Sequence, residues 1–203
     1  MELVLREKEP WLRAGVHLIC AMPALYLLYT AFMNPPGLGV NPVETLTHDT
    51  AIWALRILLV SLAITPIRLV SRWHWLVKLR RPLGLWAFFY ALAHFLIYLT
   101  FDLQYSVAAL ADDVLRRPYI TVGFAALVLL IPLAVTSTRG WQRKLQRNWV
   151  VLHRLVYAIG VLGILHFVWL RKGFQLEPLI YAAILVALLL ARPLLWRSAQ
   201  KKI

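Results

Sequence analysis

The chain has 203 residues, of which 61% are hydrophobic and 15% charged, and its mean hydropathy is +0.69. Soluble domains are about half apolar and a quarter charged, so this composition excludes an ordinary soluble domain, and it also excludes a disordered chain. The single cysteine, Cys20, excludes an internal disulfide framework and a cysteine-based metal cluster within one chain. The net charge of +13 could suggest nucleic-acid binding. The positive residues, however, form short clusters between long apolar runs, which indicates an integral membrane protein with no nucleic-acid partner.

Six apolar runs are long enough to cross the lipid bilayer, which takes about 20 helical residues. The runs are continuously apolar and lack the alternating polarity of barrel strands, so they predict helices. In chain order, the predicted spans cover residues 11–33, 51–67, 83–101, 118–136, 150–170 and 178–196. All nine tryptophans lie near an end of a predicted span, as expected at a membrane interface. The predicted fold is an all-α, polytopic membrane bundle of six transmembrane helices that forms one domain over residues 1–203.

The distribution of Lys and Arg predicts how the bundle is oriented. If the N-terminus is cytoplasmic, 17 of the 22 positive residues fall on the inner side of the membrane. Such a bias predicts an N-in, C-in orientation. The inner residues are Arg6, Lys8, Arg13, Arg68, Arg72, Lys78, Arg80, Arg81, Arg139, Arg143, Lys144, Arg147, Arg154, Arg192, Arg197, Lys201 and Lys202.

The segments between the spans are predicted to be short loops. On the outer side they cover about 34–50, 102–117 and 171–177, and the Pro35-Pro36-Gly37 sequence predicts a turn in the first of them. The chain contains neither a Walker A sequence nor a dinucleotide-binding glycine motif, which excludes an ATP-driven pump on its own. The function is therefore expected to lie within the bundle.

Three of the six histidines fall within predicted spans, and they are the main candidates for a site. His94 lies midway along the third span, His166 deep in the fifth, and His153 near the start of the fifth. Ionisable groups at membrane depth are costly and usually mark a functional site. No acidic residue lies within a predicted span core, which disfavours a proton relay of the usual acid-rich kind. Neutral imidazoles on facing helices suit the iron of a haem, although interhelical hydrogen bonding is the simpler structural alternative.

The helical rise favours His94 and His166 as the pair. With N-in topology both histidines lie in the middle to outer part of the bilayer, whereas His153 lies about 20 Å below His166. His153 and His166 are also about 140° apart on an ideal helix. Arg80 precedes His94 by 14 residues and lies within about 40° of it, where a second haem ligand could have been. Arg80 could bind a haem propionate or simply anchor the helix at the inner face, and the sequence leaves both readings open.

An ordered series of short motifs accompanies these histidines. They are Gly37-Leu38-Gly39-Val40-Asn41-Pro42, Ile64-Thr65-Pro66, Leu83-Gly84-Leu85-Trp86, Arg117-Pro118-Tyr119-Ile120-Thr121-Val122-Gly123, Thr136-Ser137-Thr138 and Leu152-His153-Arg154-Leu155-Val156-Tyr157. Together with His94 and His166, the series resembles the MsrQ (YedZ) family over essentially the whole chain. That family is similar to the ferric-reductase-like transmembrane domains, which bind b-type haem between two histidine-bearing helices.

The resemblance implies an electron-transfer subunit rather than a catalytic one. His94, His166 and His153 would be haem ligands, with one haem b expected and a second left open because Arg80 departs from the dihaem pattern. Electrons would come from membrane quinol and pass to a periplasmic molybdenum-cofactor subunit, MsrP, which reduces methionine sulfoxide in oxidised proteins. The family is also associated with FMN, although no motif locates a flavin site here. The resemblance places the protein in the bacterial inner membrane.

Three other functions stay open on the sequence. A small transporter or channel would use the histidines as a proton relay and would bind no chromophore. A structural or assembly subunit would tolerate substitution of the histidines without loss of partner activity. A haem reductase acting on extracellular ferric iron would need a nucleotide or flavin domain from a partner.

Overall fold

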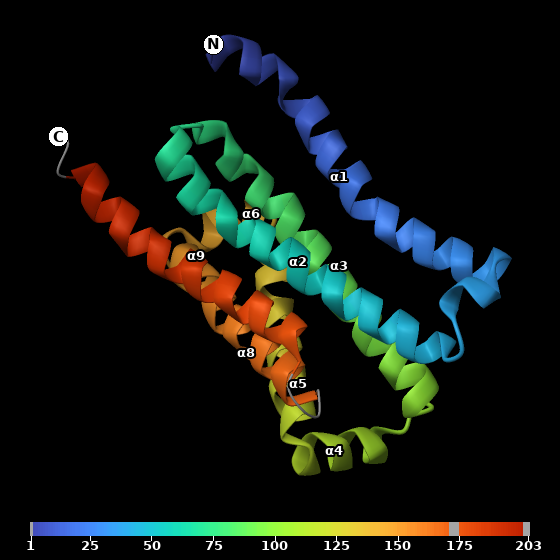
Figure 1. Ribbon diagram of the computed structural model, residues 1–203. Coiled ribbons are helices and arrows are strands. Elements are labelled where there is room, and N and C mark those ends of the chain that lie inside the picture. The colour runs from blue at the N-terminus through green and yellow to red at the C-terminus, as the bar shows by residue number, and fades with distance from the viewer. Residues whose placement is uncertain (1, 171–174, 201–203) are drawn as a thin grey trace. The chain divides into compact units, whose positions relative to one another are not determined.

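The computed structural model describes residues 2–170 and 175–200, and every regular element within them is helical (Figure 1). Six helical segments are long and apolar enough to cross a membrane, which confirms the predicted number and type of spans. The loop predicted at 171–177 falls largely outside the described residues. The six segments are Pro10–Met33, Pro42–Ser71, His74–Asp102, Pro118–Val135, Arg147–Leu170 and Leu176–Leu195.

The predicted start of the second span, residue 51, was wrong. Helix α2 (Pro42–Ser71) begins nine residues earlier, so much of the predicted loop at 34–50 is helical. The side chain of Asn41 accepts the backbone N–H of Glu44 at 3.3 Å, and Pro42 occupies the first helical position. Both are strong helix-start signals, and they outweigh the polarity of the first turns. The turn predicted just before is confirmed as a short 3₁₀ helix, η1 (Pro35–Leu38).

The third span is built from three pieces rather than one helix over 83–101. A 3₁₀ helix, η2 (His74–Leu79), leads into α3 (Arg80–Ile97), and a π-helical turn, η3 (Tyr98–Asp102), ends it. The loop predicted at 102–117 contains a further helix, α4 (Val107–Arg116). Ser106 caps α4 by accepting the N–H of Ala109 at 3.2 Å, which explains where this helix starts.

The fourth span is α5 (Pro118–Val135), and α6 (Arg139–Leu145) follows it. The fifth span, predicted as one helix over 150–170, is instead two helices, α7 (Arg147–His153) and α8 (Leu155–Leu170). His153 is thus the last residue of α7, and the angle expected for one ideal helix does not apply to it and His166. The sixth span lies in α9 (Leu176–Gln200), which starts two residues before the predicted 178–196.

The chain divides into two compact units, Met1–Ile97 with Arg192–Ile203, and Tyr98–Ala191. Within the first unit, α2 and α3 run side by side as a helical hairpin (Figure 1). Leu62 of α2 and Tyr90 of α3 are each 1% exposed at the centre of this unit. Within the second unit, α5 and α8 pack together around Ile159, which is also 1% exposed.

Side chains complete the backbone hydrogen bonding where helices of the first unit are interrupted. In α1 (Glu2–Met33), the Tyr90 hydroxyl accepts the N–H of Ala24 at 2.8 Å and donates to the carbonyl of Cys20 at 2.7 Å. An uninterrupted helix would pair these two backbone groups with each other. In α2, Pro66 lacks the N–H that would reach the carbonyl of Leu62. The Arg192 guanidinium donates to that carbonyl instead, at 2.6 Å.

Candidate functional site

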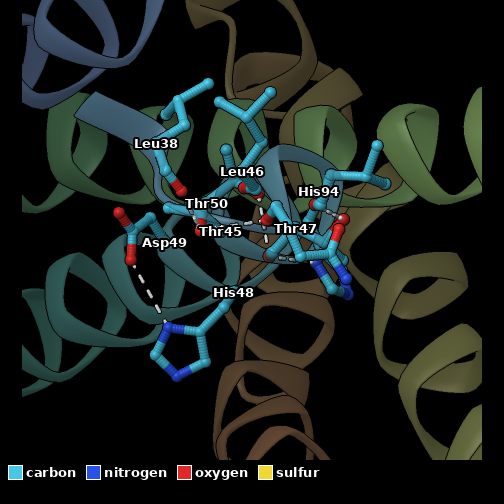
Figure 2. Close-up of polar contacts among 10 residues, drawn as sticks. Leu38, Thr45, Leu46, Thr47, His48, Asp49, Thr50 and His94 are labelled. Atoms are coloured by element: carbon cyan, nitrogen blue, oxygen red, sulfur yellow. Dashed lines mark hydrogen bonds and ion pairs between the residues drawn. The ribbon is translucent and has the colours of Figure 1, made fainter. Parts of the chain in front are cut away.

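His94 lies in the last turn of α3, half-buried against the start of α2. Its Nδ1 atom is 2.8 Å from the backbone carbonyl oxygen of Thr47. Figure 2 marks this contact with a dashed line. A carbonyl oxygen only accepts hydrogen bonds, so Nδ1 must carry the hydrogen. In the neutral ring, Nε2 then carries the lone pair that a metal ion can bind.

His166 repeats this arrangement in the second unit. Its Nδ1 atom is 2.7 Å from the backbone carbonyl oxygen of Tyr119, the second residue of α5. The Tyr119 ring also lies 6.3 Å from the imidazole, centroid to centroid, at an interplanar angle of 36°. The same reasoning puts the hydrogen on Nδ1 and the lone pair on Nε2.

The helix pairs α2–α3 and α5–α8 share a geometry that the amino-acid sequence does not reveal. In each, the acceptor carbonyl precedes its histidine by 47 residues and lies in the first two turns of the first helix. In each pair, the histidine lies within four residues of the C-terminal end of the second helix, α3 or α8. Because the acceptor is a backbone atom, no side-chain pattern marks the likeness. The sequence accordingly shows no convincing repeat.

His153 is held differently, by contacts within its own helix. Its Nδ1 atom is 3.0 Å from the carbonyl of Trp149, four residues earlier, and the two rings stack at 3.9 Å and 26°. The Trp149 indole N–H in turn donates to the carbonyl of Thr136 at 2.9 Å. His153 therefore shares the Nδ1–H form with the other two histidines, but its acceptor lies in the same helix and not in a neighbouring one.

The remaining histidines provide a comparison within the chain. The indole N–H of Trp86 donates to Nδ1 of the exposed His17 at 2.9 Å, so in a neutral His17 ring the hydrogen is on Nε2. The tautomer of His17 is thus the opposite of that in His94 and His166. His48 Nδ1 lies 3.4 Å from a carboxylate oxygen of its neighbour Asp49, and Figure 2 marks this contact with a dashed line. His74 is exposed at the start of η2.

Arg80 is the first residue of α3 and is half-buried. Its backbone carbonyl accepts the hydroxyl of Ser61 at 3.4 Å, which links the start of α3 to α2. The role of its guanidinium stays a prediction.

A polar cluster at the start of α5 was not anticipated from the sequence. The Tyr98 hydroxyl donates to the Asp113 carboxylate, whose other oxygen lies 3.1 Å from Nε of Arg117. A hydrogen bond with the Tyr119 side chain, and next the Asp113 charge, raise the pKa of the Arg117 guanidinium. The cluster places the Arg117 guanidinium, paired with the Asp113 carboxylate, two residues before the carbonyl that accepts from His166.

Comparison with known proteins supports an assignment at the level of the family. The profile of the family described as "Ferric reductase like transmembrane component" matches residues 50–164, more than half of the chain. A protein of Xanthomonas axonopodis pv. citri named "Protein-methionine-sulfoxide reductase heme-binding subunit MsrQ" is 53% identical over 153 residues, which are 75% of this chain and 70% of the relative. The chain belongs to the MsrQ group of the ferric-reductase-like transmembrane family.

A second MsrQ protein, from Herminiimonas arsenicoxydans, is 52% identical over 159 residues, 76% of this chain and 72% of the relative. No solved structure matches the chain. Membership in this group, together with the six span-length helices, makes the chain a multi-pass membrane protein with a role in electron transfer. The matched ferric-reductase segment contains His94 and His153 and ends two residues before His166.

Sequence reasoning for this MsrQ-group chain missed the partners of the two histidines. Thr47 acts through its backbone carbonyl, which every residue possesses, so its identity gave no signal. Tyr119 and Gly123 lie in one of the motifs that carry the family resemblance, and a glycine within a membrane span is a weak signal of close helix contact.

Proposed function

We propose that this protein is a haem-binding membrane subunit that passes electrons to a protein-methionine-sulfoxide reductase, with His94 and His166 as the ligands of one b-type haem. One observation carries the proposal: both histidines donate Nδ1–H to a backbone carbonyl of a neighbouring helix, at 2.8 and 2.7 Å. Histidines that bind metals almost always donate their other ring N–H in this way, which fixes the tautomer and the ring orientation. The donor set therefore fits a haem with two axial imidazoles.

The same hydrogen bonds count against a histidine proton relay. A relay through an imidazole needs a group that takes up protons on each side of the ring. On the Nδ1 side, His94 and His166 contact amide carbonyls, which do not take up a proton near neutral pH. The arrangement suits rings that are held in one orientation as ligands.

The helix order supports placing both histidines in the same half of the bilayer. Thr47 and Tyr119 lie near the N-terminal ends of the second and fourth spans, and each histidine bonds to one of them. Successive spans alternate in direction, so these two ends face the same side of the membrane. With the proposed N-in, C-in orientation that side is the outer one. This is the side from which a periplasmic partner would receive electrons.

The chain's own residues would hold the cofactor, set its environment and keep water away. When bound, a b-type haem accepts and donates single electrons at its iron, at a potential that depends on its axial ligands and surroundings. We propose membrane quinol of the bacterial inner membrane as the donor and an MsrP-like molybdenum-cofactor subunit as the acceptor. Over one cycle, oxidation of a quinol to a quinone supplies the two electrons and two protons that convert a sulfoxide to a thioether and water.

FMN and two further residues complete the proposal. FMN is included from the family resemblance alone. His153 is a third candidate ligand, which only a second haem would require. Arg80 is either a partner of a haem propionate or a membrane anchor, and Arg80→Lys separates the two roles. Lysine keeps the anchoring charge but loses the bidentate pairing with a carboxylate.

The first experiment is an oxidised-minus-reduced visible spectrum of the purified protein, with haem measured per chain. We expect a b-type spectrum with close to one haem per chain, and loss of that signal in His94→Ala and in His166→Ala. His17→Ala is the matched control, because its Nδ1 accepts a hydrogen bond from Trp86, and we expect it to keep the haem. A wild-type chain without chromophore after expression with ample haem would overturn the proposal and favour the transporter.

The donor and the partner need separate tests. Reduction of the purified protein by a quinol analogue, followed by spectroscopy, tests the donor. Sulfoxide reduction in membranes that contain the subunit and an MsrP-like reductase tests the acceptor. Loss of this activity in both histidine variants, but not in His17→Ala, would exclude a purely structural role.

A further inference from the structure

The imidazole of His166 lies unusually close to the backbone of α5. Its acceptor carbonyl belongs to Tyr119, and the residue one helical turn later is Gly123. In an α-helix, residues four apart lie on the same face, so the ring is seated over the turn from 119 to 123. A contact this close is possible only where the helix carries no side chain.

A Cβ atom at Gly123 would lie 2.6 Å from Nδ1 of His166, 2.9 Å from Cε1 and 3.0 Å from Cγ. Carbon atoms in comfortable contact lie about 3.5–4.0 Å from their neighbours. Even a methyl group would therefore push the ring back by about 1 Å at Nδ1, judged from that contact distance. Such a movement would break the 2.7 Å hydrogen bond to Tyr119, which sets the tautomer of the ring.

The α2–α3 pair shows that the hydrogen bond of His94 does not need a glycine at the matching position. There the acceptor carbonyl belongs to Thr47, and the residue one turn later is Ala51, which has a methyl group at the position that corresponds to Gly123. The hydrogen bond of His94 to the Thr47 carbonyl thus forms without a glycine one turn later. Two glycines of other spans are not constrained in this way, since a Cβ at Gly15 in α1 or at Gly84 in α3 would meet nothing within 4 Å.

We propose that Gly123 is a positioning residue for His166, which rests on the proposed role of His166 as a haem ligand. The absence of a side chain at position 123 lets the imidazole lie against α5 with Nδ1 on the Tyr119 carbonyl. The ring is thereby locked with Nε2 as the nitrogen that would bind iron. Gly123 itself touches no iron and acts only through the orientation of the histidine.

The first test measures haem binding in Gly123→Ala, with Gly15→Ala as the matched control. Haem-free protein is titrated with hemin, and the midpoint potential and low-spin electron paramagnetic resonance signal of the loaded protein are recorded. Loss of an outer-shell contact to a metal ligand costs about 10- to 100-fold in affinity. We expect a loss of that size in Gly123→Ala, with a shifted potential and an altered low-spin signal. Gly15→Ala should match the wild type in all three.

The second test needs no haem and separates this inference from the proposed function. The thermal midpoint of haem-free protein is compared for Gly123→Ala, His166→Ala and the double variant. If the methyl group collides with the ring, Gly123→Ala lowers the midpoint when His166 is present. In the His166→Ala background it leaves the midpoint unchanged or raises it, because alanine is the better helix former.

Two results would overturn the role of Gly123. One is wild-type hemin affinity, potential and low-spin signal in Gly123→Ala. The other is an equal loss of thermal stability with and without the His166 ring, which would reduce Gly123 to general helix packing. A wild-type chain that binds no hemin, combined with the expected coupling in the folding test, would instead refute the haem role and leave the steric relation intact. If Gly123→Ala alone fails to fold, recovery of folding in the double variant still supports the inference, and failure of both refutes it.

Discussion

Replacing Tyr90 with phenylalanine should weaken the attachment of α1 to α3. The hydroxyl of Tyr90 satisfies two backbone groups of α1, the N–H of Ala24 at 2.8 Å and the carbonyl of Cys20 at 2.7 Å, and its side chain is 1% exposed. Hydrogen bonds from side chains within membrane proteins contribute about 0.6 kcal/mol on average and about 1.7 at most. Losing two of them should lower the free energy of unfolding by about 1–3 kcal/mol.

The assay is equilibrium unfolding in detergent, supported by labelling of the thiol of Cys20. Cys20 is the only cysteine of the chain and is 5% exposed, so its reaction with a maleimide reports local opening of α1. A loss of about 1.4 kcal/mol should speed labelling about tenfold. The matched control is Tyr29→Phe on the same helix, whose side chain is 57% exposed, with an expected change within about 0.5 kcal/mol. Equal effects of the two substitutions would refute the idea that the Tyr90 hydroxyl stabilises α1 by bonding to two of its backbone groups.

Three further predictions concern other contacts and the orientation. Arg192→Met should lower the free energy of unfolding by about 1–3 kcal/mol because the Leu62 carbonyl loses its donor. The loss should be smaller in a Pro66→Ala background, where residue 66 regains an N–H that can bond to this carbonyl, and a double-mutant cycle measures the difference. Chemical denaturation of Asp113→Asn should show a loss of about 1 kcal/mol, whereas Asp112→Asn, whose pair with an arginine is more exposed, should stay within about 0.5 kcal/mol. A fluorescent protein fused to the C-terminus should fluoresce and alkaline phosphatase fused there should be inactive, and the opposite pattern would overturn the C-in orientation.

The number and type of spans could be predicted because the bilayer imposes length, continuous hydropathy and internal hydrogen bonding on each segment. The limits of the spans could not, because helices extend beyond the apolar core wherever capping residues allow it. Asn41 and Pro42 start α2 nine residues before the predicted limit of 51, and Ser106 starts a helix inside a predicted loop. Hydropathy indicates which part of a segment lies in the lipid, whereas capping residues determine where the helix begins.

The candidate histidines could be singled out from the sequence, whereas their supporting contacts could not. His94 and His166 stood out because a buried ionisable side chain is costly unless it has a role. The carbonyls of Thr47 and Tyr119 carry no signature of their own, since every residue has such a group. The tautomer of each histidine, which distinguishes both from His17, therefore depends on packing that only the structure reveals.

Several polar side chains of the spans bond to backbone groups, which bears on the proposed site. Tyr90 and Arg192 bond to backbone groups where a helix is interrupted, and hydroxyls such as that of Thr50 bond to a carbonyl four residues earlier in their own helix. Each of these contacts satisfies a polar group that lipid cannot. His94 and His166 likewise bond to a backbone carbonyl through Nδ1. That contact fixes the tautomer and the orientation of each ring, as hydrogen bonds to metal-binding histidines commonly do. Two imidazoles held in this way would suit a haem iron, and this physical argument connects the backbone hydrogen bonds to the proposed electron transfer.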